Sequence, residues 1–230
     1  IPIAVVPFKG DTPHASDIAR QMGEVIQQDL ASTGLFRFLD PHSFIQQDVH
    51  IDLPPRFGDW RLLKVQALLN GFISMVDENT LKVRYRFWDI YAGESAGEQS
   101  LQTQVRYWRR IAHLIADQIY RTLTGEVGYF DTRIVYVTEE AKGTQQKKRL
   151  AIMDQDGANH KFLTSGRYIV LTPRFSPSLQ QVAYLSYEHK YPKVFILDLE
   201  TGRHELVGKF PGMTFAPRFS PDGKRLVMSQ

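Results

Sequence analysis

Apolar residues recur three or four positions apart in three segments of the first half of the chain, a spacing typical of helices with one buried face. The first set is Ile18, Met22, Val25, Ile26 and Leu30. The second is Trp60, Leu63, Ala67 and Leu68, and the third is Trp108, Ile111, Ala112, Ile115, Ile119 and Leu123. These sets predict a helix with Ser16 as its N-cap and Gly34 at its end, a helix that begins after Asp59, and a helix that stops at Gly125.

Shorter apolar runs between these helices predict the strands of a sheet. They cover residues 3–8, 35–39, 71–76, 81–87 and 100–105. In the fourth run, apolar residues alternate with Lys82, Arg84 and Arg86, so one face of this strand is expected to be buried and the other exposed to solvent. Residues 1–130 are therefore predicted to form an N-terminal α/β domain, in which helices cover a mixed sheet.

The pattern changes after residue 131, where helical spacing disappears and short strand-like runs alternate with turn residues. The motif Pro-Arg-Phe-Ser-Pro at residues 173–177 recurs at residues 217–221, an offset of 44. A repeat of about 40–45 residues with four strands is typical of a β-propeller blade. The predicted fold class is thus α+β and multidomain, with the first two to three propeller blades in residues 131–230. Since a propeller closes with about four to eight blades, we expect the chain to be a piece of a longer protein.

Charge and composition narrow the range of functions. Residues 1–129 carry 13 Lys and Arg against 15 Asp and Glu, whereas residues 130–230 carry 15 against 10. The second half is therefore mildly basic and suited to an acidic protein partner. The basic residues are scattered rather than clustered, which argues against nucleic acid as a partner. The chain has no cysteine, which excludes disulfides and a thiol nucleophile, and no apolar run approaches the length of a membrane span.

Motifs that carry chemistry are missing from the sequence. There is no G-x-S-x-G elbow, no phosphate-binding loop and no H-E-x-x-H pair. The seven histidines are far apart in sequence and form no local zinc pair. We therefore predict a protein that is not an enzyme and that has no catalytic residue, cofactor or metal site.

Three segments carry a family resemblance. The turn Phe-Ser-Pro-Asp-Gly-Lys at residues 219–224, the first strand at residues 2–8, and the junction at residues 122–137 resemble the TolB family, the periplasmic propeller proteins of the Tol–Pal system. The resemblance runs over nearly the whole chain and is weakest between residues 40 and 60. It implies a monomeric periplasmic protein that binds the peptidoglycan-associated lipoprotein Pal through one face of the propeller, that supports outer-membrane integrity and cell division, and that some colicins exploit. It also implies contact with TolA through an N-terminal extension, which does not precede the first strand here.

The segments that link one blade to the next, residues 168–172 and 213–216, contain more apolar residues than exposed loops normally carry. Such side chains either anchor a partner or pack between blades. The resemblance places them on the Pal-binding face. The residues predicted to bind the partner are Met213, Thr214, Phe215, Ala216, Arg218 and Arg174.

Two rival functions remain open. The blades are also compatible with the propeller domain of a serine peptidase whose catalytic domain lies beyond residue 230, since no G-x-S-x-G elbow lies within residues 1–230. The strand with Lys82, Arg84 and Arg86 is compatible with a nucleic-acid-binding face, although Tyr85 and Phe87 are expected to point away from these basic side chains.

Overall fold

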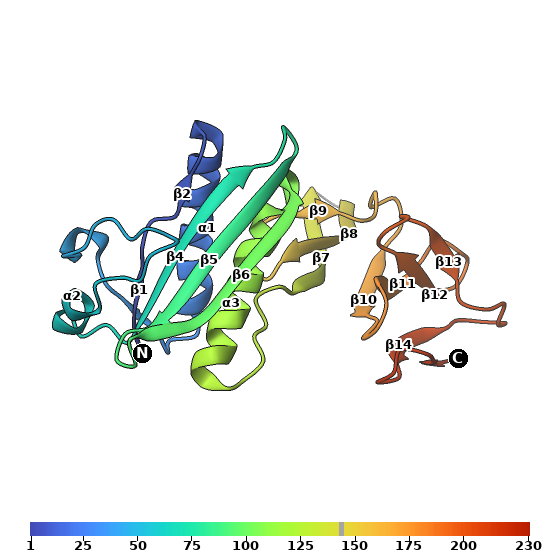
Figure 1. The fold of residues 1–230 in the computed structure, drawn as a ribbon. Helices are drawn as coiled ribbons and strands as arrows, with labels where there is room; N and C mark the ends of the chain where they lie inside the picture. Colours follow the sequence, from blue (N-terminus) through green and yellow to red (C-terminus); the bar gives the residue numbers. More distant parts are fainter. Residues whose placement is uncertain (143–144) are drawn as a thin grey trace. The chain divides into compact units, whose positions relative to one another are not determined.

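The computed structural model describes residues 1–142 and 145–230 (Figure 1). The chain divides into two units, Ile1–Asp131 and Thr132–Gln230. Unit 1 holds three α-helices and a mixed sheet, and the described part of unit 2 is built from antiparallel strands. This architecture, an α/β domain followed by propeller blades, confirms the predicted fold class.

The sheet of unit 1 has the strand order β3-β1-β4-β5-β6, and the short strand β2 also pairs with β4. The strands are β1 (Pro2–Val5), β2 (Lys9–Gly10), β3 (Arg37–Phe38), β4 (Ala67–Met75), β5 (Thr80–Asp89) and β6 (Glu94–Gln104). The helices are α1 (Pro13–Ser32), α2 (Phe57–Leu62) and α3 (Trp108–Thr124), with 3-10 turns at Pro41–Ser43 and Val105–Tyr107. Strand β1 runs parallel to β3 and β4, whereas β4, β5 and β6 are antiparallel. The sheet is therefore mixed, as the sequence predicts.

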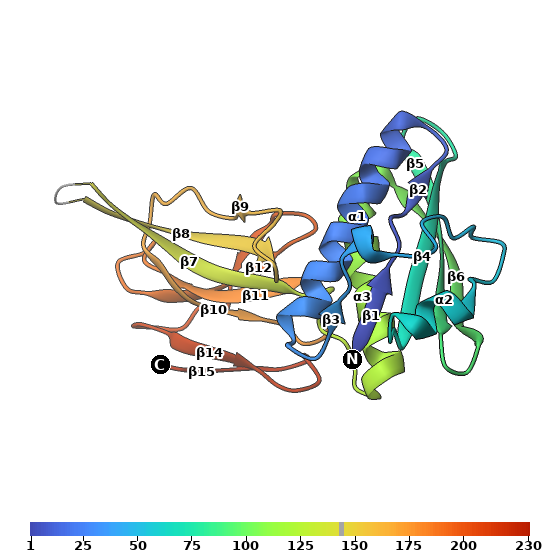
Figure 2. The ribbon, with the colours of Figure 1, turned by 90° about the vertical axis from the view of Figure 1, so that its left-hand side faces the viewer.

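Helices α1 and α3 lie side by side on one face of this sheet, and α2 lies on the other face (Figure 2). The larger core forms under α1 and α3, where Met22 and Ile115 pack with the sheet residues Leu69 and Val83. A smaller core lies on the α2 side and includes Trp60. In β5 the apolar side chains face the larger core and the basic ones face the opposite side of the sheet, which explains why apolar and basic residues alternate along this strand.

The predicted start of the first helix is wrong. Thr12 is the N-cap, since its Oγ1 accepts a hydrogen bond from the Ala15 amide at 3.1 Å, and Pro13 occupies the first helical position. Proline fits there because its missing N–H has no partner in the first turn anyway. The helix ends as predicted near Gly34, which adopts a left-handed φ of 71°.

The second helix is shorter than the apolar spacing indicated. It ends at Leu62, and Ala67 and Leu68 begin β4 instead of extending the helix. Strand β4 pairs with both β1 and β5, and its first five residues are buried. A strand buried on both faces reads as a continuous apolar run, which periodicity cannot separate from a buried helix.

The described strands of unit 2 form three sheets. The first holds β7 (Arg133–Lys142), β8 (Gln145–Asp154) and β9 (Lys161–Phe162). The second holds β10 (Val170–Phe175), β11 (Gln181–Ser186), β12 (Lys193–Asp198) and β13 (His204–Leu206). The third holds β14 (Phe215–Phe219) and β15 (Leu226–Ser229). The four-stranded antiparallel sheet is one propeller blade, and the other two sheets correspond to parts of the preceding and following repeats.

The 44-residue repeat places β10 and β14 at equivalent positions of successive blades. The segments predicted as links, residues 168–172 and 213–216, run into these strands, so that Val170 begins β10 and Phe215 begins β14. A register shift interrupts both strands, between Leu171 and Arg174 in β10 and at the equivalent place in β14. The strand signal was missed because the bulge and the proline at each copy break the alternation of apolar and polar residues.

Candidate partner-binding surface

The two segments predicted to bind a partner lie where the chain enters β10 and β14. Met213 is 47% exposed and Phe215 is 40% exposed. In the earlier copy, Ile169 is 42% exposed and Tyr168 is 36% exposed. These four apolar side chains therefore reach solvent instead of filling the space between sheets. Exposed apolar residues in adjoining loops are a feature of protein-binding sites.

Thr214 differs from its neighbours because its side chain is buried, with 1% exposed. Its Oγ1 accepts a hydrogen bond from the Val194 amide at 3.0 Å, and its own amide donates to the Pro192 carbonyl at 3.0 Å. Pro192 directly precedes β12 and Val194 is its second residue. Thr214 therefore fixes the segment between the exposed side chains of Met213 and Phe215.

Arg174 and Arg218 are exposed and occupy equivalent positions after the bulges. Each guanidinium donates to the carbonyl oxygen of the proline before it, at 3.0 Å from Pro173 and 2.8 Å from Pro217. These bonds hold the two cations close to their own strands. We name the set Met213, Thr214, Phe215, Ala216, Arg218 and Arg174 the link surface.

A second group of exposed residues, which was not predicted from the sequence, lies in the loops around β12 and β13. Lys190 and Tyr191 lie in the loop before β12, and Lys209 and Phe210 lie in the loop after β13. Tyr191 is 45% exposed and Phe210 is 42% exposed. The signal was available, because in each loop a lysine is followed directly by an aromatic residue, but the two pairs are far apart in sequence.

The basic residues of β5 form ion pairs in the structure. Arg84 pairs with Asp52, and Arg86 pairs with Glu98 at 2.7 Å. The Arg84 guanidinium beside Asp52 holds the pKa of that carboxyl below its usual range. Tyr85 is buried in the core under α1 and α3. This arrangement favours an ordinary solvated sheet face over a platform for bases, because two of its cations are already matched by carboxylates.

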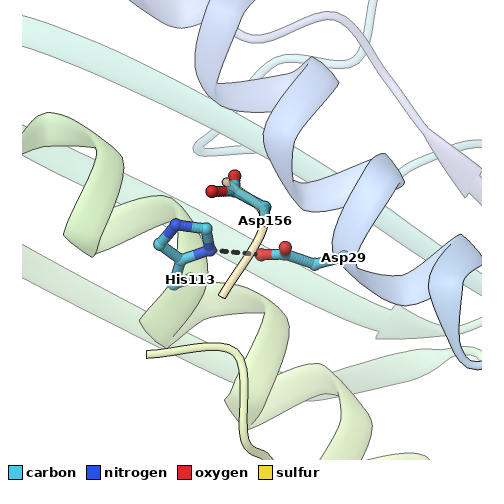
Figure 3. Close-up of side chains that lie close together, drawn as sticks. All are labelled: Asp29, His113 and Asp156. Atoms are coloured by element: carbon cyan, nitrogen blue, oxygen red, sulfur yellow. Dashed lines mark hydrogen bonds and ion pairs between the residues drawn. The ribbon is translucent and has the colours of Figure 1, made fainter. Parts of the chain in front are cut away.

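A buried histidine–carboxylate pair joins the two long helices of unit 1 (Figure 3). Asp29 of α1 and His113 of α3 have 1% and 2% of their side chains exposed, and Asp29 Oδ2 lies 2.6 Å from His113 Nδ1. The pair occupies the contact between α1 and α3, whose remaining buried residues are mostly apolar. The pair therefore links the two helices through a buried polar contact.

In residues 1–142 and 145–230, none of the helices combines the length and the apolar character that a membrane-spanning helix needs.

Comparisons with known proteins agree with this architecture over both units. A family model described as the TolB amino-terminal domain matches residues 1–96, and one described as the TolB beta propeller domain matches residues 120–230. The Tol-Pal system protein TolB of Pelagibacter ubique (strain HTCC1062) is 49% identical over 225 residues, which is 94% of this chain and 50% of that protein. The crystal structure of TolB from Acinetobacter baumannii superimposes with a TM-score of 0.81 at 29% identity, covering 98% of this chain and 53% of that one.

Fold and sequence thus define the class, a protein with an α/β domain followed by β-propeller blades. Within that class the chain belongs to the TolB family, as the resemblance in the sequence indicated. It spans about half the length of the relatives it matches.

Proposed function

We propose that this chain is part of a non-enzymatic, periplasmic interaction scaffold of the Tol–Pal system, and that it binds the peptidoglycan-associated lipoprotein Pal through the link surface. The observation that carries the proposal is the exposure of Met213 and Phe215 on either side of the buried Thr214. Apolar side chains presented on a fixed backbone lose little conformational freedom on binding, which makes them efficient anchors.

Family membership supports the Tol–Pal setting, since the Pelagibacter ubique relative is named as a protein of that system. In this proposal the scaffold contributes to outer-membrane integrity and cell division, and colicins compete for the same surface. TolA is engaged elsewhere, through a segment N-terminal to the first strand. The mechanism is binding without chemical turnover.

The test is the affinity of the full-length protein for the soluble domain of Pal, measured by isothermal titration calorimetry. Phe215→Glu places a charge at the centre of the link surface and is expected to weaken binding about tenfold or more, because a buried anchor carries a large share of the binding energy. Leu179→Glu is the matched control, since Leu179 is also exposed, at 51%, and lies in the turn between β10 and β11. The control is expected to bind within about twofold of the wild type, as surface changes away from an interface have small effects.

Equal affinities for wild type, Phe215→Glu and Leu179→Glu would show that Pal does not bind at the link surface. No binding by the wild type would refute the proposed partner.

A further inference from the structure

An open groove of about 560 Å³ lies in unit 2 beside the link surface. One wall is the loop between β11 and β12, with Lys190 and Tyr191, and the other is the loop between β13 and β14, with Lys209 and Phe210. Lys193 and Leu206 also line it. A volume of this size falls within the range of about 300–1,000 Å³ that is usual for ligand sites.

Hydrogen bonds tie the two walls together. The Lys193 ammonium donates to the carbonyl oxygens of Phe210 and Gly212 in the opposite loop. The Thr214 amide donates to the Pro192 carbonyl a few residues further along. Lys193 therefore holds the groove in shape, and Lys190 and Lys209 supply the exposed charges.

The lining has a net positive charge. It contains three lysines and His189 and no aspartate or glutamate. Two acidic residues adjoin the lining in sequence without belonging to it, Glu188 before His189 and Glu205 before Leu206, and Glu205 pairs with Arg203 at 2.9 Å. An anionic occupant therefore meets uncompensated positive charge in the groove.

Two aromatic side chains accompany the lysines. Tyr191 and Phe210 are both more than 40% exposed, and Lys190 Nζ lies 5.5 Å from the centre of the Tyr191 ring. Exposed aromatic side chains are enriched where proteins bind other proteins, and lysines contribute there through complementary charge. They suit an occupant that carries both carboxylates and apolar side chains.

We infer that this groove binds an acidic, extended segment of a protein partner, in which carboxylates alternate with apolar side chains. The carboxylates face Lys190 and Lys209, and the apolar side chains pack on Tyr191 and Phe210. The inference deepens the proposed function and rests on it, because the loop that forms one wall runs directly into the link surface at Met213. Single-stranded nucleic acid is a poorer match, since it needs cations that track several successive phosphates.

The test compares two charge-reversed forms of the full-length protein. Lys190→Glu combined with Lys209→Glu reverses the groove and leaves Lys193 in place. Lys161→Glu combined with Lys224→Glu is the matched control, because it changes the net charge equally at exposed positions outside the lining. The probes are the soluble domain of Pal and an eight-residue peptide of alternating aspartate and leucine, both measured by fluorescence anisotropy at low and physiological salt.

The groove variant is expected to bind both probes about tenfold more weakly than the wild type, and the control within about twofold, with the difference shrinking as salt rises. Unfolding curves that coincide for the three proteins exclude a folding defect. If wild type binds Pal and the groove variant binds it equally well, the inference is wrong while the proposed function stands.

If the wild type binds no Pal but binds the peptide through the lysines, Pal is the wrong partner, and the inference that the groove binds an acidic segment stands. If the wild type does not bind the peptide, the inference that the groove binds an acidic segment is wrong. The inference is also wrong if an anionic vesicle or a single-stranded oligonucleotide binds more tightly than the peptide and if that binding depends on Lys190 and Lys209.

Discussion

Thr172 and Ala216 stand 44 residues apart and adopt the same left-handed backbone conformation, with φ of 49° and 54°. Each precedes the proline of its Pro-Arg-Phe-Ser-Pro motif and lies within the register shift of its strand. Few residues other than glycine adopt this conformation, and β-branched residues do so least readily. The repeat therefore preserves a strained backbone geometry as well as a motif, at the place where each link enters its blade.

Ala216→Val is expected to destabilise the protein by about 1–2 kcal/mol, because a β-branched side chain crowds the backbone at positive φ. Ala216→Gly keeps the conformation without that crowding and is expected to change stability by less than about 1 kcal/mol. Differential scanning calorimetry of the two variants checks the difference. Equal melting temperatures for the valine and glycine forms would show that the conformation is not retained in solution.

Thr214→Val is expected to cost about 1–3 kcal/mol, since it leaves the buried amide of Val194 without its hydrogen-bond acceptor. Thr214→Ser keeps the hydroxyl and is expected to retain most of the stability. Urea unfolding measures both. The valine form is also expected to bind Pal more weakly, because Met213 and Phe215 lose their fixed spacing. A valine form as stable as the serine form would rule out this hydrogen bond as the anchor of the segment.

Much of the fold could be predicted because its signals are local or periodic. The alternation in β5 marked a sheet with two different faces, and the 44-residue offset marked equivalent strands in successive blades. The start of the first helix was misjudged at a local cap, Thr12, and the extent of the second because tertiary contacts decide it. Ala67 and Leu68 are strand residues because β1 and β5 pair with them on either side, and no local property of the sequence reports that pairing.

In the candidate site, too, some features are visible in the sequence and others depend on contacts between distant residues. Met213 and Phe215 stand out in the sequence as apolar residues in a loop, but the burial of Thr214 between them depends on the amide of Val194, twenty residues away. The lysine groove was missed because Lys190 and Lys209 come together only through the β12–β13 hairpin. The charge counts show an excess of basic residues in residues 130–230, but they do not show which of these residues cluster in space.

Stability is expected to fall as the pH drops below about 6.5, in part because of His204. Burial lowers the pKa of His204 from its ordinary value, and the charge of Glu188 opposes the shift. The Tyr184 hydroxyl lies 2.7 Å from His204 Nδ1, where it can donate only to the neutral ring. Because the unfolded chain binds a proton at higher pH than the folded chain, acidification through this window favours unfolding.

His204→Gln removes this titration, so its urea midpoint is expected to fall less than that of the wild type between pH 8 and pH 5. Tyr184→Phe removes the donor that favours the neutral ring and is expected to reduce the acid sensitivity in part. Parallel curves for wild type and His204→Gln would exclude His204 from the acid response.

The Asp29–His113 pair is expected to be strongly coupled energetically, since both side chains are buried at 2.6 Å between α1 and α3. Removing one side chain, in Asp29→Ala or His113→Leu, deprives the other buried group of this hydrogen bond and should cost about 3–5 kcal/mol. The double variant should cost less than the sum of the single variants, by about 1–3 kcal/mol. Urea unfolding followed by tryptophan fluorescence measures the cycle, because Trp60, Trp88 and Trp108 all lie in unit 1. Strictly additive losses would mean that the two residues stabilise their helices independently, through contacts other than the one they share.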